Sequence, residues 1–150
     1  MIVVDANYFV RAMVRPVTPL DTIMAQTAET LFRRVKRGED VMTTTDAVIA
    51  EVVFALQRHY GLTRADIAAR LRPMLQLRGF KLPTKRLCLT ALDLWETSPK
   101  ISFVDALAAA QARNGGRALA TFDQDLGKVA AVTLWQPPAP VSQNGSKDHQ

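Results

Sequence analysis

The chain has 150 residues, of which 48% are hydrophobic and 22% are charged, values typical of one globular domain and unlike those of a disordered or fibrous chain. No apolar run reaches the roughly 18 residues of a membrane-spanning helix. The single cysteine excludes a disulfide framework and a cysteine-based metal site, and with only two distant histidines zinc has almost no ligands; a reducing cytoplasm is the simplest location. The net charge of +5, with arginine supplying 13 of 19 basic residues, favours a polyanionic partner.

Short apolar segments alternate along the chain with segments of helical periodicity. The predicted strands are 2–4, 41–44, 118–121 and 132–135. The predicted helices are 21–37, 45–60, 63–78 (kinked or split at Pro73), 84–97 and 102–113. This alternation predicts βαβ units, an α/β fold and a mostly parallel sheet. Residues 137–150, rich in Pro, Ser, Asn and Gly, are expected to form a disordered tail after a domain of residues 1–136.

Two acidic residues follow predicted strands. Asp5 comes directly after the first strand, and Asp123 lies just beyond the strand at 118–121. Ligands of parallel sheets bind outside the carboxyl ends of the strands, so both acids are expected at the binding edge. The structural alternative for each is a helix N-cap or a turn residue, positions where Asp is common.

Two further acids lie on helices that are otherwise apolar. Glu51 is the only polar residue between 47 and 56, which predicts a buried helix in which a carboxylate must be paired or bound to metal. A buried ion pair with an arginine, or a place at the edge of the buried face, is the structural alternative. Asp105 and Gln111 are the only polar residues between 103 and 112, and Ser102 with Asp105 also has the spacing of a capping box.

Taken together, these four acids predict a metal site. Four converging carboxylates repel one another unless a cation lies among them. Ligand sets made only of oxygen favour Mg²⁺ or Mn²⁺ over zinc or copper. A carboxylate-held metal in a basic protein suits phosphodiester hydrolysis, because the metal activates water and stabilises charge on the phosphate.

The four segments resemble, in order, the motifs of PIN-domain ribonucleases, specifically VapC-type toxins of bacterial toxin–antitoxin pairs. They read IVVDANYFV, DAVIAEVVFAL, ISFVDALAAAQARNGG and ALATFDQDLGKV, within about residues 1–135. The resemblance implies a three-layer α/β sandwich in which helices flank a central, mostly parallel sheet. It implies an endoribonuclease in which one or two Mg²⁺ or Mn²⁺ ions are held by the catalytic residues Asp5, Glu51, Asp105 and Asp123.

The resemblance also implies auxiliary residues and partners. Asn7 would orient ligands or water near Asp5, Thr121 would place a hydroxyl beside the metal, and Asp125 would be an auxiliary acid unless it is only a turn or cap residue. The implied partners are an RNA substrate, a VapB-like antitoxin that blocks the acidic pocket, and a second copy in a homodimer.

Other functions fit parts of the same pattern. An aspartate-nucleophile phosphatase would need a second acid where Asn7 stands, so we discount it. A non-catalytic, basic nucleic-acid-binding module would use its acids only structurally, and a degraded nuclease would bind without cutting. Arg11, Arg15 and Arg113 are candidates to hold an RNA backbone, whereas Asp46 is expected to be only an N-terminal helix residue.

Overall fold

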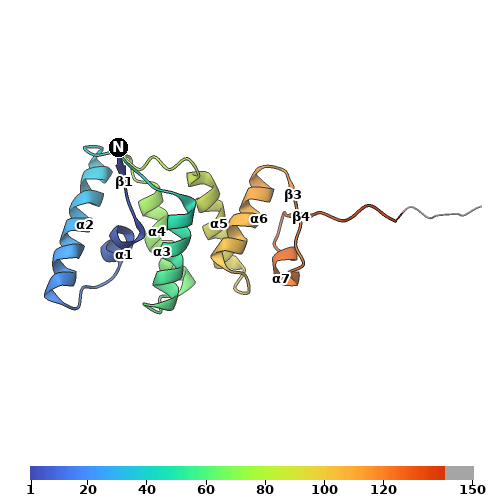
Figure 1. The fold of residues 1–150 in the computed structure, drawn as a ribbon, viewed down its shortest axis with the longest axis horizontal. Helices are drawn as coiled ribbons and strands as arrows, with labels where there is room; N and C mark the ends of the chain where they lie inside the picture. Colours follow the sequence, from blue (N-terminus) through green and yellow to red (C-terminus); the bar gives the residue numbers. More distant parts are fainter. Residues whose placement is uncertain (141–150) are drawn as a thin grey trace, which may run out of the picture.

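The computed structural model describes residues 1–140 of the chain. Its elements follow one another in an elongated row that runs from α2 to the β3–β4 pair (Figure 1). In chain order they are β1 (Ile2–Val3), α1 (Ala6–Met13), α2 (Pro19–Arg37), β2 (Met42–Thr43), α3 (Asp46–Arg58), α4 (Arg64–Leu75), α5 (Lys85–Thr97), α6 (Phe103–Asn114), β3 (Ala118–Leu119), α7 (Gln124–Gly127) and β4 (Thr133–Leu134).

The strands are parallel and form two separate pairs. Strand β1 pairs with β2, which also bridges to Phe80 on its far side. Strand β3 pairs with β4 at the other end of the row. The α/β class and the parallel pairing are thus confirmed. The prediction of one central sheet is wrong for residues 1–140, because β1 and β3 are not hydrogen-bonded to each other.

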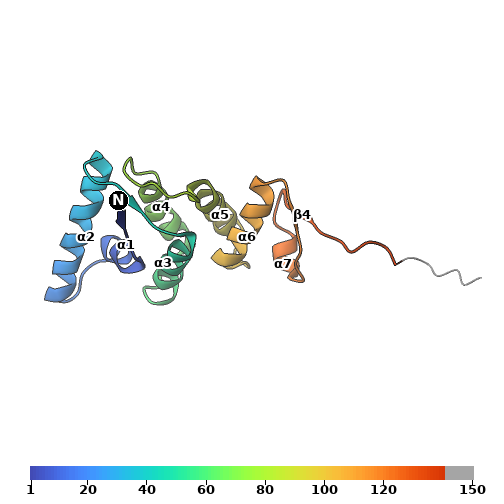
Figure 2. The ribbon, with the colours of Figure 1, turned by 45° about the horizontal axis from the view of Figure 1, so that its top comes forward.

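The position of β3 explains the separation of the two pairs. A short turn through Gly115 and Gly116 connects α6 to β3, which packs back against that helix. Helix α6 packs mainly against α5, and α5 against α4. In two views 45° apart, α3, α5 and α6 lie between β1 and the β3–β4 pair (Figure 2). The C-terminal strands therefore follow α6 rather than β1.

Helix boundaries agree with local capping signals. Thr18 and Asp21 form a capping box at the start of α2, and Gly38 ends that helix in the left-handed conformation at φ 74°, which glycine adopts without strain. Helix α4 ends at Leu75, three residues before the predicted end at Arg78, and Pro73 lies in its last turn. Proline lacks a backbone N–H and its ring clashes with the preceding turn, so Pro73 opposes a regular continuation of the helix.

Helix α1 was not predicted, although the sequence contains a signal for it. Asp5 caps its N-terminus, and Phe9, Val10 and Met13 are buried at helical spacing. The Phe9 ring lies 5.3 Å from the ring of Phe32 in α2 and 5.8 Å from that of Phe80. Aromatic packing therefore holds α1 against α2 and the β2 edge.

The core extends along the row of helices. Its largest fully buried side chains include Trp95, Phe9, Phe80, Met42, Ile49 and Leu56. Within residues 1–140, no helix combines the length and the apolar character needed to cross a membrane. Of the tail expected at 137–150, residues 137–140 form no helix or strand, and 141–150 lie outside the described residues.

Candidate functional site

Asp5 lies where predicted, directly after the first strand. It is exposed and caps α1, because its carboxylate accepts a hydrogen bond of 3.1 Å from the backbone N–H of Asn7. The side chain of Asn7 is also exposed. This single cap leaves several lone pairs of the Asp5 carboxylate free for another ligand.

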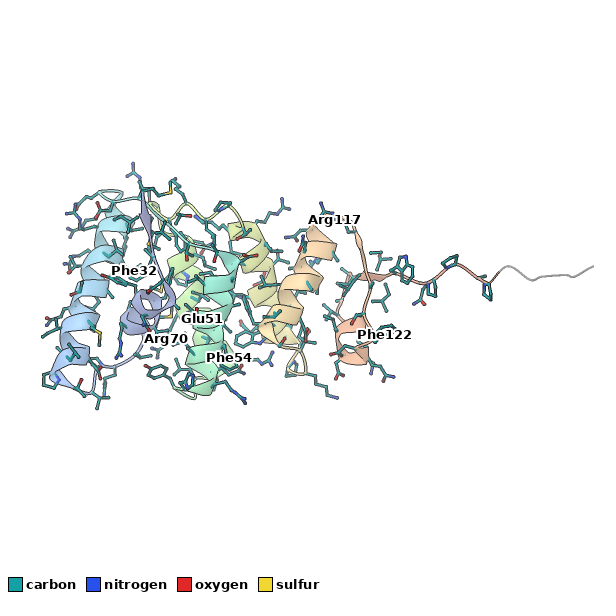
Figure 3. All side chains as sticks on the ribbon, viewed as in Figure 1. Phe32, Glu51, Phe54, Arg70, Arg117 and Phe122 are labelled. Atoms are coloured by element: carbon teal, nitrogen blue, oxygen red, sulfur yellow. The ribbon has the colours of Figure 1, made fainter. Side chains whose placement is uncertain are left out.

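Glu51 does not have the environment that the sequence predicted. Helix α3 buries Ile49, Val52, Val53 and Leu56 on one side. Its other side is exposed and carries Glu51 with Phe54 (Figure 3). The prediction of a buried Glu51 is therefore wrong, because α3 packs against the core through one side only and Glu51 lies on the side that faces solvent. The alternative of a buried ion pair is wrong as well.

Asp105 is half-buried in the first turn of α6 and forms the predicted capping box with Ser102. The backbone N–H of Asp105 donates to the Ser102 hydroxyl at 3.1 Å, and the Ser102 N–H donates to the carboxylate at 3.3 Å. The box satisfies two N–H groups at the helix start. Asp105 therefore has a structural role in addition to any catalytic one.

Asp123 caps α7 at the other end of the row. One of its carboxylate oxygens accepts hydrogen bonds from the backbone N–H groups of Asp125 at 2.8 Å and Leu126 at 3.1 Å. The Thr121 hydroxyl accepts the N–H of Asp123 at 3.0 Å. Thr121 thus orients the segment that carries Asp123, and Asp125 is a half-buried residue of the first turn.

The four predicted ligands do not meet in one chain. Across residues 1–140, no group of three or more His, Cys, Asp or Glu side chains could hold a metal ion. Asp5 follows β1 and Asp123 follows β3, and these strands lie on opposite sides of α3, α5 and α6 (Figures 1 and 2). The oxygen donors suit Mg²⁺ or Mn²⁺ chemically, but their arrangement in a single chain does not. The predicted convergence within one chain is therefore wrong, whereas the catalytic role of each residue stays a prediction.

The three arginines proposed to contact RNA differ in their interactions. Arg11 forms a salt bridge of 2.8 Å with Asp21 and so ties α1 to α2. Hydrogen bonding from the Thr18 backbone N–H, aided by the Arg11 charge, lowers the pKa of Asp21. Arg15 and Arg113 are exposed and form no salt bridge within residues 1–140. Arg11 is therefore a structural cation, and the other two are free to contact a polyanion.

A hollow that the sequence did not predict lies beside β1. It has a volume of about 450 Å³ and lies between β1 and α2, with Asp5 and Tyr8 at its border. The pattern of β1 gives no sign of it, because a short apolar strand is normally covered on both sides. Its position next to Asp5 makes it part of the candidate site.

Acidic residues just beyond parallel strands lie where α/β proteins commonly bind their ligands. Residues 2–132 match the PIN domain family model. The chain therefore belongs to the PIN domain family, whose members are generally nucleases and typically use divalent metal ions. No curated protein matches the chain.

Proposed function

We propose that this protein is a metal-dependent endoribonuclease that hydrolyses RNA phosphodiester bonds with Mg²⁺ or Mn²⁺. In this proposal Asp5, Glu51, Asp105 and Asp123 are the catalytic and metal-binding residues, with Asn7, Thr121 and Asp125 as auxiliary residues. The protein is the toxin of a toxin–antitoxin pair, works in the cytoplasm as a homodimer, and is inhibited by a VapB-like antitoxin.

Membership of the PIN family over residues 2–132 is the observation that carries the proposal. The environment of the four acidic residues also supports the proposal. Asp5, Glu51 and Asp123 are exposed and Asp105 is half-buried, and none forms a salt bridge with another described residue. Uncompensated carboxylates attract cations, while the net charge of +5 favours the RNA backbone.

The decisive experiment compares two acids in matched positions. Asp105 follows the cap Ser102 by three residues in α6, and Asp66 follows the cap Thr63 by three residues in α4; the N–H of each donates to the cap hydroxyl. With a fluorescent single-stranded RNA in Mn²⁺, we expect Asp105→Asn to lose at least about 100-fold in cleavage rate, as removal of one electrostatic group from an active site does. Asp66→Asn should cleave like the wild type.

Equal cleavage by both variants would assign Asp105 a capping role only. EDTA should abolish cleavage by the wild type, and Mg²⁺ or Mn²⁺ should restore it. RNA binding without cleavage in either metal would instead identify a non-catalytic basic module of the same fold. The toxin assignment requires a growth defect on expression that is lost in Asp105→Asn and relieved by the neighbouring antitoxin gene.

A further inference from the structure

Strands β1 and β3 each have one edge without a strand partner. Within residues 1–140, β1 pairs only with β2, and β3 pairs only with β4. Proteins usually protect free edges with charged residues, proline or a covering element. Strand β1 consists of Ile2–Val3 and β3 of Ala118–Leu119, so neither strand contains a charged residue or a proline. Both edges are therefore able to accept another strand.

The hollow beside β1 provides space for such a strand. Its lining includes the consecutive residues Ile2, Val3 and Val4. Successive strand residues point to opposite faces, so a hollow that reaches all three runs along the edge of the strand and not over one face. Strand β2 occupies the other edge. The hollow of about 450 Å³ therefore follows the free edge.

Large apolar side chains in and after the two strands, and on α3 and α6, remain uncovered in one chain. Val3 in β1 is 77% exposed, and Phe122, three residues after β3, is fully exposed. Phe54 on α3 and Val104 in the first turn of α6 are also exposed. Figure 3 shows Phe122 at the end of the molecule remote from α2. Apolar surface of this kind next to an open strand edge favours association.

The natural partner for each edge is a second copy of the chain. The β3 strand of the same chain is held against its own α6 and is separated from β1 by α3, α5 and α6. A second copy supplies an identical β3–β4 pair and receives one in return, which closes the assembly with two-fold symmetry. We propose that two copies exchange these pairs, giving two sheets of order β2-β1-β3-β4, each with two strands from each copy.

This exchange would complete the metal site in trans, a step that rests on the proposed nuclease function. With parallel addition, the carboxyl ends of β1 and β3 lie at one edge, which places Asp5 of one copy near Asp123 of the other. Helix α6 runs opposite to β3 because a short turn joins them, so Asp105 lies at that same end. Each site then combines Asp5 and Glu51 from one copy with Asp105 and Asp123 from the other.

Association is tested by measuring mass with light scattering during gel filtration in Mn²⁺. We expect the wild type at twice the chain mass of 16.6 kDa. Val3→Arg places a charge at the free edge and should raise the dimer dissociation constant at least about tenfold. Val17→Arg is the control, because Val17 is 89% exposed but precedes α2 and lies outside the exchanged surface. A monomeric wild type, or a Val3→Arg variant that dimerises like the wild type, would overturn the proposal.

The origin of each site is tested by co-expressing two inactive variants with different tags and purifying the mixed dimer. Asp5→Asn with Asp123→Asn should recover about half the wild-type activity, because one of the two composite sites is intact. The pair of Asp5→Asn with Glu51→Gln should recover no activity. Both residues belong to the same half of a composite site, so each of the two sites in the mixed dimer contains one of the substitutions. If the wild type cleaves RNA but the pair of Asp5→Asn with Asp123→Asn recovers no activity, assembly of the site in trans is refuted. If the wild type itself cleaves no RNA, the nuclease function fails, and the masses alone decide the strand exchange.

Discussion

Arg64 offers the sharpest test of how the helical row is held together. Its guanidinium donates hydrogen bonds to four backbone carbonyls, those of Trp95 at 2.8 Å, Ser98 at 3.2 Å, Pro99 at 3.0 Å and Ile101 at 2.8 Å. It also lies 4.7 Å from the centre of the Trp95 ring. One side chain of α4 thus fixes the loop that leads into α6 and positions the Asp105 cap.

The expected effect of Arg64→Ala follows from these contacts. Hydrogen bonds to a charged group contribute about 1.5–3 kcal/mol each, but freed loop carbonyls recover much of this from water, so we expect a net loss of about 3 kcal/mol. With an unfolding entropy of roughly 2.1 cal/mol/K per residue, that lowers the Tm by about 10 °C. Arg64→Lys cannot span four carbonyls and should lose about half as much.

Thermal unfolding followed by circular dichroism, with urea titrations alongside, measures both variants. Arg72 is the matched control, because it leaves the same helix toward α5 but pairs at the surface with Asp93 at 2.6 Å. A surface pair contributes about 1 kcal/mol or less, so Arg72→Ala should shift the Tm by only a few degrees. If Arg64→Ala moved the Tm no further than Arg72→Ala, the carbonyl cluster would not be what holds the loop.

Three further predictions address single positions. Burial raises the pKa of the Cys88 thiol from 9.0 to about 11, so native Cys88 should react with iodoacetamide at pH 8 at least about 100-fold more slowly than in urea. The raised pKa stabilises the folded state below pH 9, and this stabilisation is lost as the pH rises toward 11. Urea titrations should therefore show that the unfolding free energy of the wild type falls by about 2 kcal/mol more than that of Cys88→Ala over that range. A Cβ on Gly79 would lie 2.3 Å from the Asp40 carbonyl oxygen, so Gly79→Ala should lower the unfolding free energy by about 1–3 kcal/mol, measurable in the same titrations.

Local signals in the sequence were sufficient for helices α2 to α6 but not for α1 and α7. The box at Ser102 and the glycine after α2 lie where the pattern placed them, because caps depend on neighbours within one turn. The exposure of Glu51 could not be predicted in this way. Every residue from 47 to 56 except Glu51 is apolar, so hydrophobicity does not distinguish the two sides of α3. Which side faces solvent depends on where distant helices pack.

Local signals in the sequence also could not predict whether the two strand pairs belong to one sheet. Strands β1 and β3 have two residues each, so a pairing between them involves few hydrogen bonds. The packing of α6 on α5 involves many apolar side chains and decides where β3 lies. The sequence predicted correctly that Asp5 and Asp123 follow strands, but the sheet to which each strand belongs, in one copy or between two, depends on contacts far apart in the chain.

The structural roles of the acids determine how their chemistry must be tested. Asp5 and Asp123 cap helices, and Asp105 belongs to a capping box. An Ala variant of such a cap would lose about 0.5–2 kcal/mol of stability along with the charge, so lost activity could reflect local unfolding. Asn keeps an oxygen that accepts the capping N–H and removes only the charge. If the residue is a metal ligand, its Asn variant should therefore lose RNA cleavage while its Tm stays within a few degrees of the wild type. If the residue only caps a helix, its Asn variant should keep both the cleavage and the Tm.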